Sequence, residues 1–200
     1  MRIFKPWRAL VAAAAAAPSA VLAHTGLPDT QDALHGFMHP IAGLDHVLAM
    51  VAVGVIAAQL GGKALWALPM CFVAVMAIAG ASAMGGQALP GAEVGIAISV
   101  LVLGVLIARS VKLPVVLLGA MVALFAVFHG HAHGVEMAGG SSGMAFGLGF
   151  VSATALLHLV GVGLGLALGR AGTGRGQHLA RAGGRAVALT GALLLAGSFS

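Results

Sequence analysis

The chain has 200 residues, of which 60% are hydrophobic and only 8% are charged. A soluble globular domain carries about 25% charged residues, so this composition excludes one and indicates a protein embedded in a lipid bilayer. It also excludes intrinsic disorder, and a single cysteine excludes an intramolecular disulfide. The formal net charge of +5 comes from scattered basic residues with no tyrosine among them, so it does not indicate nucleic-acid binding.

The first residues have the three parts of a secretory signal peptide. Three cations lie within the first eight residues, and an apolar segment over residues 10–17 follows. Val21 and Ala23 then suit the −3 and −1 positions of a cleavage site, so residues 1–23 are predicted to be removed and His24 to become the first residue. The alternative is an uncleaved anchor, but the apolar segment is shorter than the roughly 20 residues that cross a bilayer.

Residues 24–200 are predicted to form an all-α polytopic bundle of six membrane-spanning helices. With about 20 apolar residues for each span, the predicted spans are 41–60, 64–84, 92–108, 113–132, 144–168 and 184–199. If the signal peptide exports residue 24, all seven Lys and Arg residues that follow it fall on the cytoplasmic side. This bias predicts that both ends of the mature chain are periplasmic.

Two clusters of ionisable residues are predicted at the same level of the membrane. Asp45 and His46 lie about five residues into the first span, roughly 7 Å below its start. His129 and His133 end the fourth span on one helix face, and Glu136 would return to that face. A charged group inside a membrane costs ~2.5 to 3.5 kcal/mol on insertion scales, so such groups normally face the bundle interior in pairs.

The first cluster is predicted to bind a divalent transition metal. Pro40 suits the first turn of a helix, which would place His39 just before the helix and His46 two turns along it. Met50 follows four residues after His46 and can share its face. Imidazole nitrogens with a carboxylate oxygen and at most a thioether suit Ni²⁺, Co²⁺ or Zn²⁺. Asp45 can instead hold an imidazole tautomer, and without a metal the pair would hydrogen bond to the backbone or to each other.

The second cluster alternates histidine with small residues. His129, His131 and His133 precede Glu136, and such short histidine-rich tracts commonly bind metal. The alternative is a solvated loop that binds stray metal weakly.

Two other histidines are candidates with ordinary alternatives. His158 lies about fourteen residues into the fifth span, ~21 Å deep, on the side of Gly165 and Gly169. Gly161, Gly165 and Gly169 are predicted to pack against a neighbouring helix. His158 is then either a deeper relay for the ion or a core histidine that bonds a backbone carbonyl. After cleavage, the amine and ring of His24 could chelate metal, unless the terminus is frayed.

Two segments closely resemble the HupE/UreJ family, namely residues 39–54 (HPIAGLDHVLAMVAVG) and residues 128–136 (FHGHAHGVE). The resemblance extends to ALLH at residues 155–158. The family consists of small bacterial membrane proteins with a cleaved signal, associated with hydrogenase or urease maturation and regarded as nickel permeases. The resemblance therefore implies nickel import, with ion handling by His39, Asp45, His46, His129, His133 and Glu136. Further candidates are His24, Met50, His131 and His158.

The predicted function is a permease in the bacterial inner membrane that moves nickel, or else cobalt or zinc, from periplasm to cytoplasm. Its expected partners are the bilayer, the ion and hydrogenase or urease maturation proteins. No Gly-x₄-Gly-Lys-[Ser/Thr] motif indicates a nucleotide site, and no His-Glu-x-x-His motif indicates an enzyme. The alternatives are a haem-binding electron-transfer subunit with histidine axial ligands and a metal-binding accessory protein that does not transport.

Overall fold

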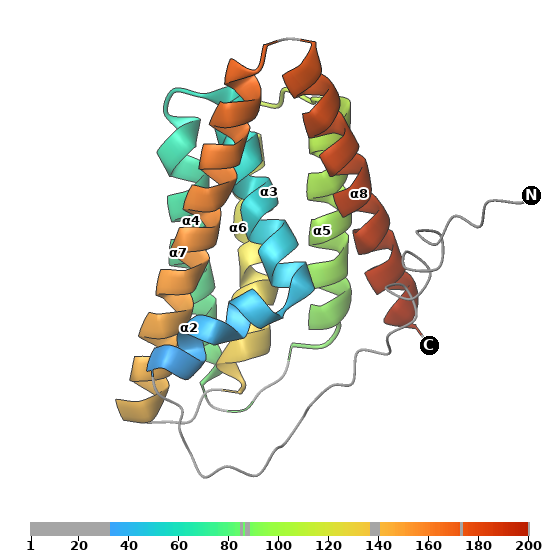
Figure 1. Cartoon of the computed structure of the whole chain (residues 1–200). Coiled ribbons are helices and arrows are strands. Elements are labelled where there is room, and N and C mark those ends of the chain that lie inside the picture. Colours follow the sequence, from blue (N-terminus) through green and yellow to red (C-terminus); the bar gives the residue numbers. More distant parts are fainter. Residues whose placement is uncertain (1–32, 85, 87–88, 137–140, 173, 200) are drawn as a thin grey trace, which may run out of the picture. The chain divides into compact units, whose positions relative to one another are not determined.

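The structure is a computed structural model, and it describes residues 33–84, 86, 89–136, 141–172 and 174–199. The predicted signal peptide, its cleavage site and His24 lie outside these residues. Residues 31–200 form one structural unit, whose described part contains seven helices and no strand (Figure 1). The helices are α2 (Ala33–Ala42), α3 (Leu44–Leu60), α4 (Ala64–Ala83), α5 (Ala92–Arg109), α6 (Val115–Gly134), α7 (Ser141–Arg170) and α8 (Arg175–Gly197).

Five of these helices, α4 to α8, are long and apolar enough to cross a membrane. The bent pair of α2 and α3 supplies a sixth span only if the two helices are counted as one. A long apolar segment becomes helical because a bilayer offers its backbone no other hydrogen-bond partners. Large side chains such as Trp66, Val116 and Leu193 are exposed, as expected where acyl chains cover them. The chain is therefore an all-α, multi-pass membrane protein, as predicted.

The segment predicted as one span over 41–60 is broken in the structure. α2 ends at Ala42, α3 begins at Leu44, and their axes differ by 83°. Gly43 between them has an extended backbone, with φ −85° and ψ 112°. Pro40 lies near the end of α2, where its missing N–H helps to end the helix. The prediction that Pro40 begins a helix and that His39 precedes it is therefore wrong.

The last helix is longer than the span predicted for it. The prediction of 184–199 covers only the later part of α8, which begins at Arg175 and ends at Gly197. Hydropathy leaves out the segment before Gly184 because it contains Arg175 and Arg181. Arg is nevertheless a good helix former, and its long side chain can reach the membrane interface. The helix therefore extends beyond its apolar part.

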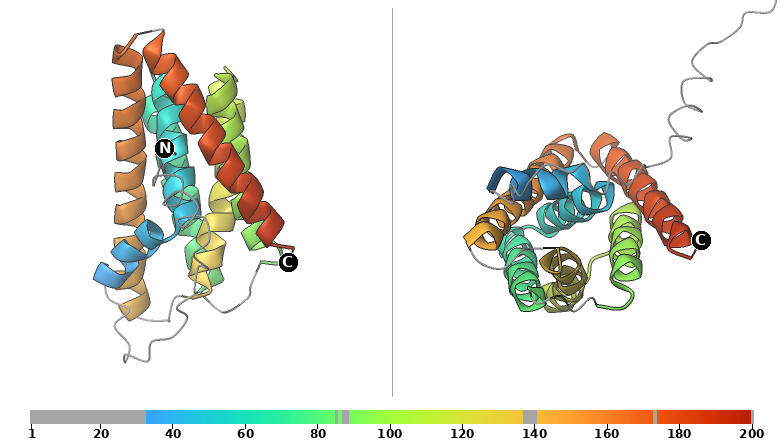
Figure 2. Two further views of the ribbon diagram at one scale, coloured as in Figure 1. Left: turned by 45° about the vertical axis from the view of Figure 1, so that its right-hand side comes forward. Right: turned by 90° about the horizontal axis from the view of Figure 1, so that it is seen from below.

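Helices far apart in sequence form the closest pairs of the bundle. α3 packs along α7, α4 along α6, and α5 along α8. α3 lies between α7 and α5 when the bundle is viewed from below (Figure 2), and most of its middle is buried, from Ala49 to Ala57. α2 packs against α7 at one end of the bundle (Figure 1). These pairings bring both predicted clusters to the same end.

Glycines allow α3 and α7 to approach at backbone distance. A Cβ at Gly54 would overlap the carbonyl oxygen of His158, and one at Gly161 would overlap that of Val51. A Cβ at Gly165 would lie 2.6 Å from the Cβ of Ala58 on α3, but one at Gly169 would meet nothing within 4 Å. The predicted packing role is therefore correct for Gly161 and Gly165 and wrong for Gly169, which lies beyond the contact between the helices.

Candidate metal centre

The break between α2 and α3 makes room for a carboxylate and imidazole pair. One Asp45 oxygen accepts hydrogen bonds from the backbone N–H and the ring Nδ1–H of His46, both at 2.8 Å. A Cβ at Gly43 would lie 2.9 Å from that oxygen and 3.2 Å from Nδ1, so a larger residue here would displace the Asp45 carboxylate. Because Asp45 accepts the Nδ1 hydrogen, the Nε2 of a neutral His46 has a free lone pair. Asp45 thus orients the ring that follows it.

The end of α6 presents histidines to one neighbour and glycines to another. His129 and His133 lie four residues apart on one face, as predicted. Gly130 and Gly134 pack against the carbonyls of Met76 and Gly80 on α4, where a Cβ would overlap. The alternation of histidine and glycine in this segment therefore serves two purposes, and the packing purpose was not recognised in the sequence.

The structure brings the two clusters into direct contact. The Nε2 atoms of His133 and His46 are 2.7 Å apart, and His133 Nδ1 lies 2.9 Å from His39 Nε2. The Oε2 of Glu136 lies 3.3 Å from His133 Nδ1 and 3.4 Å from His39 Nε2. His39 and His133, from different clusters, are 94 positions apart in sequence. Their predicted convergence at one end of the bundle is therefore present.

Three of these atoms form a triangle of the right size for a metal ion. They are His39 Nε2, His133 Nδ1 and Glu136 Oε2, with edges of 2.9, 3.3 and 3.4 Å. Ligand atoms about 2.1 Å from an ion lie about 3.0 Å apart in octahedral and about 3.4 Å apart in tetrahedral coordination. One divalent ion can therefore touch all three atoms without a change of the backbone.

The proton positions also favour a cation at this triangle. His46 Nε2 is an acceptor, because the other ring hydrogen goes to Asp45. A neutral His133 that donates from Nε2 to His46 has no hydrogen left on Nδ1. That Nδ1 then accepts the Nε2 hydrogen of His39, 2.9 Å away, and no hydrogen lies between it and the Glu136 carboxylate. A metal ion at the triangle would take the place of the His39 hydrogen.

Glu136 gives the triangle its negative charge and is its most exposed side chain. Its side chain is 57% exposed, whereas the ring of His133 is largely buried. The neighbouring ring of His133 holds the pKa of the Glu136 carboxyl below its ordinary value, although partial burial opposes this. The carboxyl is therefore ionised at neutral pH and can attract a cation.

The sequence of this chain matches a known protein family. The sequence model described as HupE / UreJ protein matches residues 11–194. The chain belongs to the HupE/UreJ family. It is 48% identical over 186 residues to Protein HupE of Rhizobium leguminosarum bv. viciae, an alignment that covers 92% of this chain and 95% of that relative. No solved structure matches it. The resemblance found in the sequence is confirmed.

In this HupE/UreJ protein, phenylalanines of α7 form an apolar wall beside the triangle. The ring of Phe150 lies 5.0 Å from that of His133, 6.1 Å from that of His39 and 6.3 Å from that of His46. Phe146, one turn earlier, contacts His39 and also His35. An apolar shell of this kind limits the access of water to a metal site. No sequence signal distinguished these rings from other apolar residues of the span.

His129 lies behind the triangle and has its own partner. Its ring is 4.5 Å from that of His46, and its Nε2 is 3.0 Å from Ser99 Oγ. Ser99 donates its hydrogen to the carbonyl of Ile96 at 2.6 Å, so it accepts the Nε2 hydrogen of His129. The Nδ1 lone pair of His129 is therefore left free. A lone serine in the apolar segment 92–108 was the available signal for this partner.

The other candidates of this HupE/UreJ protein lie apart from the triangle. Met50 is completely buried in the apolar core around α3. His158 is buried on α7 and bonds a backbone carbonyl, one of the two roles expected for it. His131 has a buried Nδ1 that finds no hydrogen-bond partner within the described residues. None of these three side chains contributes an atom to the triangle.

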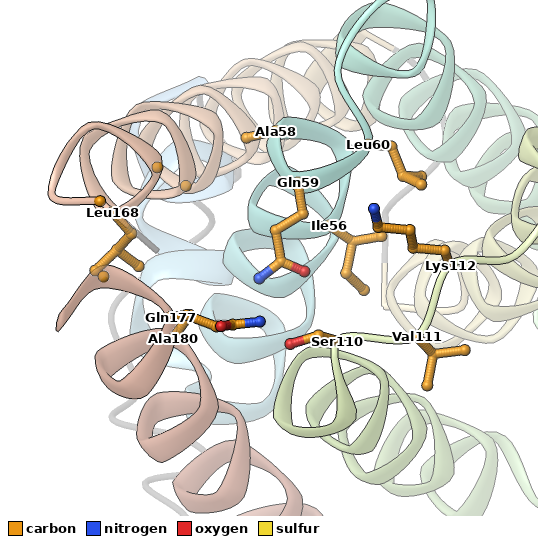
Figure 3. A pocket seen from close by; sticks show the side chains of 14 residues that line it. Ile56, Ala58, Gln59, Leu60, Ser110, Val111, Lys112, Leu168, Gln177 and Ala180 are labelled. Carbon is orange, nitrogen blue, oxygen red and sulfur yellow. The ribbon is translucent and has the colours of Figure 1, made fainter. Parts of the chain in front are cut away.

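A pocket of about 360 Å³ lies at the opposite end of the bundle. Gln59, which lines it, is thirteen residues beyond His46 on α3, or about 20 Å. Figure 3 shows the side chains of Gln59, Gln177 and Ser110 gathered on one side, with Lys112 near Leu60. Gly169 also lines this pocket, which explains why it makes no helix contact.

Proposed function

We propose that this HupE/UreJ protein is a permease that imports a divalent transition metal, nickel in the first place, for hydrogenase or urease maturation. The observation that carries the proposal is the triangle of His39 Nε2, His133 Nδ1 and Glu136 Oε2. These three ligand atoms come from two helices and the residues that follow one of them, at one end of a multi-pass membrane protein. The ion is the substrate, and the protein catalyses no covalent reaction in this proposal.

The orientation proposed for import puts the triangle at the periplasmic side of a bacterial inner membrane. In support, Asp45, Glu93 and Glu136 lie at this end of their helices. The described Lys and Arg residues lie at or near the opposite ends, apart from Arg185 in the middle of α8. Lysine and arginine accumulate on the cytoplasmic side of membrane proteins. Both ends of the mature chain would then be periplasmic.

Capture of the ion follows from the geometry of the triangle. Ionised Glu136 attracts the hydrated ion, and the rings of His39 and His133 replace part of its water. His133 donates a hydrogen bond from Nε2 to His46, which in turn donates one to Asp45, so the ligand ring keeps one orientation. The ring of His46 contacts the buried ring of His129, and this contact leads the ion from the triangle into the bundle. Release requires that each step be reversible.

The donor set supports nickel without excluding related ions. Imidazole nitrogens suit nickel, zinc and copper, and a carboxylate adds a hard oxygen. The resemblance of both motifs to a family of nickel permeases makes nickel the first choice, with cobalt and zinc as competitors.

The ring contacts do not favour the haem alternative. Nitrogen atoms of His46 and His133 are 2.7 Å apart, and those of His39 and His133 are 2.9 Å apart. These distances leave no space for a porphyrin between two of these rings. The alternative of a binding protein without transport is tested by flux.

The test is Ni²⁺ flux into proteoliposomes that contain the full chain and a metal-sensitive dye. We expect uptake by the wild-type protein in preference to Co²⁺ and Zn²⁺, and loss of uptake in His133→Ala. The control is His178→Ala, which removes an exposed histidine of α8. Flux no greater than in empty liposomes, although Ni²⁺ binds, would instead support the accessory protein.

A further inference from the structure

His158 has a buried nitrogen for which the fold provides no hydrogen-bond partner. The side chain lies in the middle of α7, and the residue is only 1% exposed. Its Nδ1 donates to the carbonyl of Thr154 at 2.7 Å, so a neutral ring has a bare lone pair on Nε2. Within the described residues this Nε2 finds no partner. A purely structural histidine would be expected to have both ring nitrogens satisfied.

The free lone pair of His129 provides a matching position nearer the triangle. Its Nδ1 is also buried and without a hydrogen-bond partner in the described part of the chain. Ser99 holds the hydrogen on the other ring nitrogen, as described above. Two buried imidazoles are thus both set with one nitrogen free, His129 by a hydroxyl and His158 by a carbonyl.

Phe72 connects the two histidines. Its ring centroid is 5.5 Å from that of His129 and 5.0 Å from that of His158. The face of an aromatic ring attracts a cation, most strongly where water is excluded. Met76, one turn further along α4, brings its sulfur within 3.7 Å of the hydroxyl of Thr154. An aromatic ring therefore contacts His158, and a soft thioether lies beside Thr154, one turn earlier on α7.

The depth of His158 places it between the triangle and the pocket at the other end. The carbonyl of His158 lies against Gly54, which is eight residues beyond His46 on α3, or about 12 Å. Gly165, which lines the pocket, follows seven residues after His158, or about 10 Å. The intervening residues of α3, such as Met50, Val53 and Ala57, are apolar and buried.

We propose that His158 Nε2 is a second, inner binding position for the same divalent ion, which reaches it from His129 past the face of Phe72. The inference rests on the permease function proposed above, and it names the step that follows capture. His158 divides the apolar distance between the triangle and the opposite pocket into two shorter steps.

The experiment combines equilibrium dialysis of Ni²⁺ with flux, both on the full chain. Wild-type protein in detergent is expected to bind two ions, one at the triangle and one at His158. His158→Leu should lose one ion and about tenfold or more of the flux, while the triangle keeps its affinity within about twofold, as for distant sites. His158→Met, which restores a soft donor, should regain part of the flux. His178→Leu, at an exposed position of α8, is the matched control and should match wild type.

Each outcome decides the proposal. A wild-type chain that binds only one ion overturns it, and this measurement does not depend on the folding of a variant. Two bound ions and wild-type flux in His158→Leu also overturn it, while leaving the permease function intact. If wild type shows no flux but His158→Leu still loses one of two ions, the inner position stands and the transport function fails.

Discussion

At the scale of single residues, two hydrogen-bond acceptors determine which nitrogen of each histidine is free. Asp45 accepts a hydrogen bond from Nδ1 of His46, and Ser99 accepts one from Nε2 of His129. A metal ligand needs a lone pair rather than a hydrogen, so these two residues matter although neither is part of the triangle. The sequence indicated such a role for Asp45, whereas Ser99 was recognised only from its contact.

Removing the charge of Asp45 should weaken metal binding without removing a ligand. Asp45→Asn keeps the shape of the side chain but can donate a hydrogen bond, so His46 is no longer held in one tautomer. Loss of such an outer partner typically costs 10- to 100-fold in affinity, and we expect about that loss for Ni²⁺. Titration calorimetry measures it, with Glu93→Gln as the control at an exposed acid of the same end. Equal affinity in the two variants would contradict the role given to Asp45.

The pH dependence of uptake should follow the histidines and not Glu136. The ordinary pKa of a histidine is about 6.5, and a protonated ring cannot bind a metal. Lowering the pH from about 7.5 to about 5.5 should therefore reduce Ni²⁺ uptake. Because the pKa of Glu136 is held below its ordinary value, the carboxylate stays ionised throughout this range.

Glu136→Gln separates the two contributions. It should lower the affinity and move the midpoint of the pH profile to lower pH in proteoliposomes buffered equally on both sides, because the carboxylate favours protonation of the neighbouring rings. A flat profile in wild type, or a midpoint moved to higher pH in the variant, would show that the histidines do not set this dependence.

At the scale of the elements, the bent pair of α2 and α3 carries His39 to the triangle. α2 is held by a tight crossing with α7, because a Cβ at Gly36 would overlap the carbonyl of Phe146 and one at Gly149 that of Ala33. The hydropathy of residues 41–60 indicated one continuous span, since Gly43 does not interrupt its apolar character and Pro40 suited its first turn. The 83° bend instead depends on the extended backbone at Gly43 and on the packing of α2 against α7.

A larger residue in this crossing should detach His39 while leaving the rest of the bundle in place. Gly36→Leu forces α2 away from α7, and overpacking of this kind typically costs ~1 to 3 kcal/mol. We expect a lower melting temperature and loss of most Ni²⁺ affinity. Gly163→Leu is the control, because a Cβ there meets nothing within 4 Å. Wild-type affinity in Gly36→Leu would show that α2 does not position a ligand.

At the scale of the whole molecule, the two polar regions lie at opposite ends of an apolar core. The triangle is at one end, the pocket that contains Gln59 and Lys112 is at the other, and buried apolar residues of α3 separate them. Many transporters consist of two halves with the same fold and opposite orientations in the membrane. If the first three spans of this chain were related in this way to the last three, the pair α3·α7 would correspond to the pair α4·α6, and the pair α5·α8 would lie on the axis between the halves. Such a repeat is a hypothesis for this chain.

Filling the pocket at the opposite end should block release without affecting capture. Gly169 borders the pocket, and a Cβ there has open space, so Gly169→Phe should fold and occupy part of the volume. We expect unchanged Ni²⁺ binding by calorimetry and a reduction of flux by about tenfold, as for loss of a supporting contact. Gly163→Phe, away from the pocket, is the control. Normal flux in Gly169→Phe would mean that the ion leaves by another route.

The sequence by itself determined the membrane class, the helical fold and the presence of two histidine clusters at one membrane level. These follow from local properties, because hydropathy and helical spacing are read within about 20 residues. Tertiary structure decided which atoms meet. The contact of His39 with His133 joins residues 94 positions apart, and Ser99, Phe72 and Phe150 gain their roles only from neighbours on other helices. Spacing along one helix cannot predict these partners, because they depend on how the helices pack.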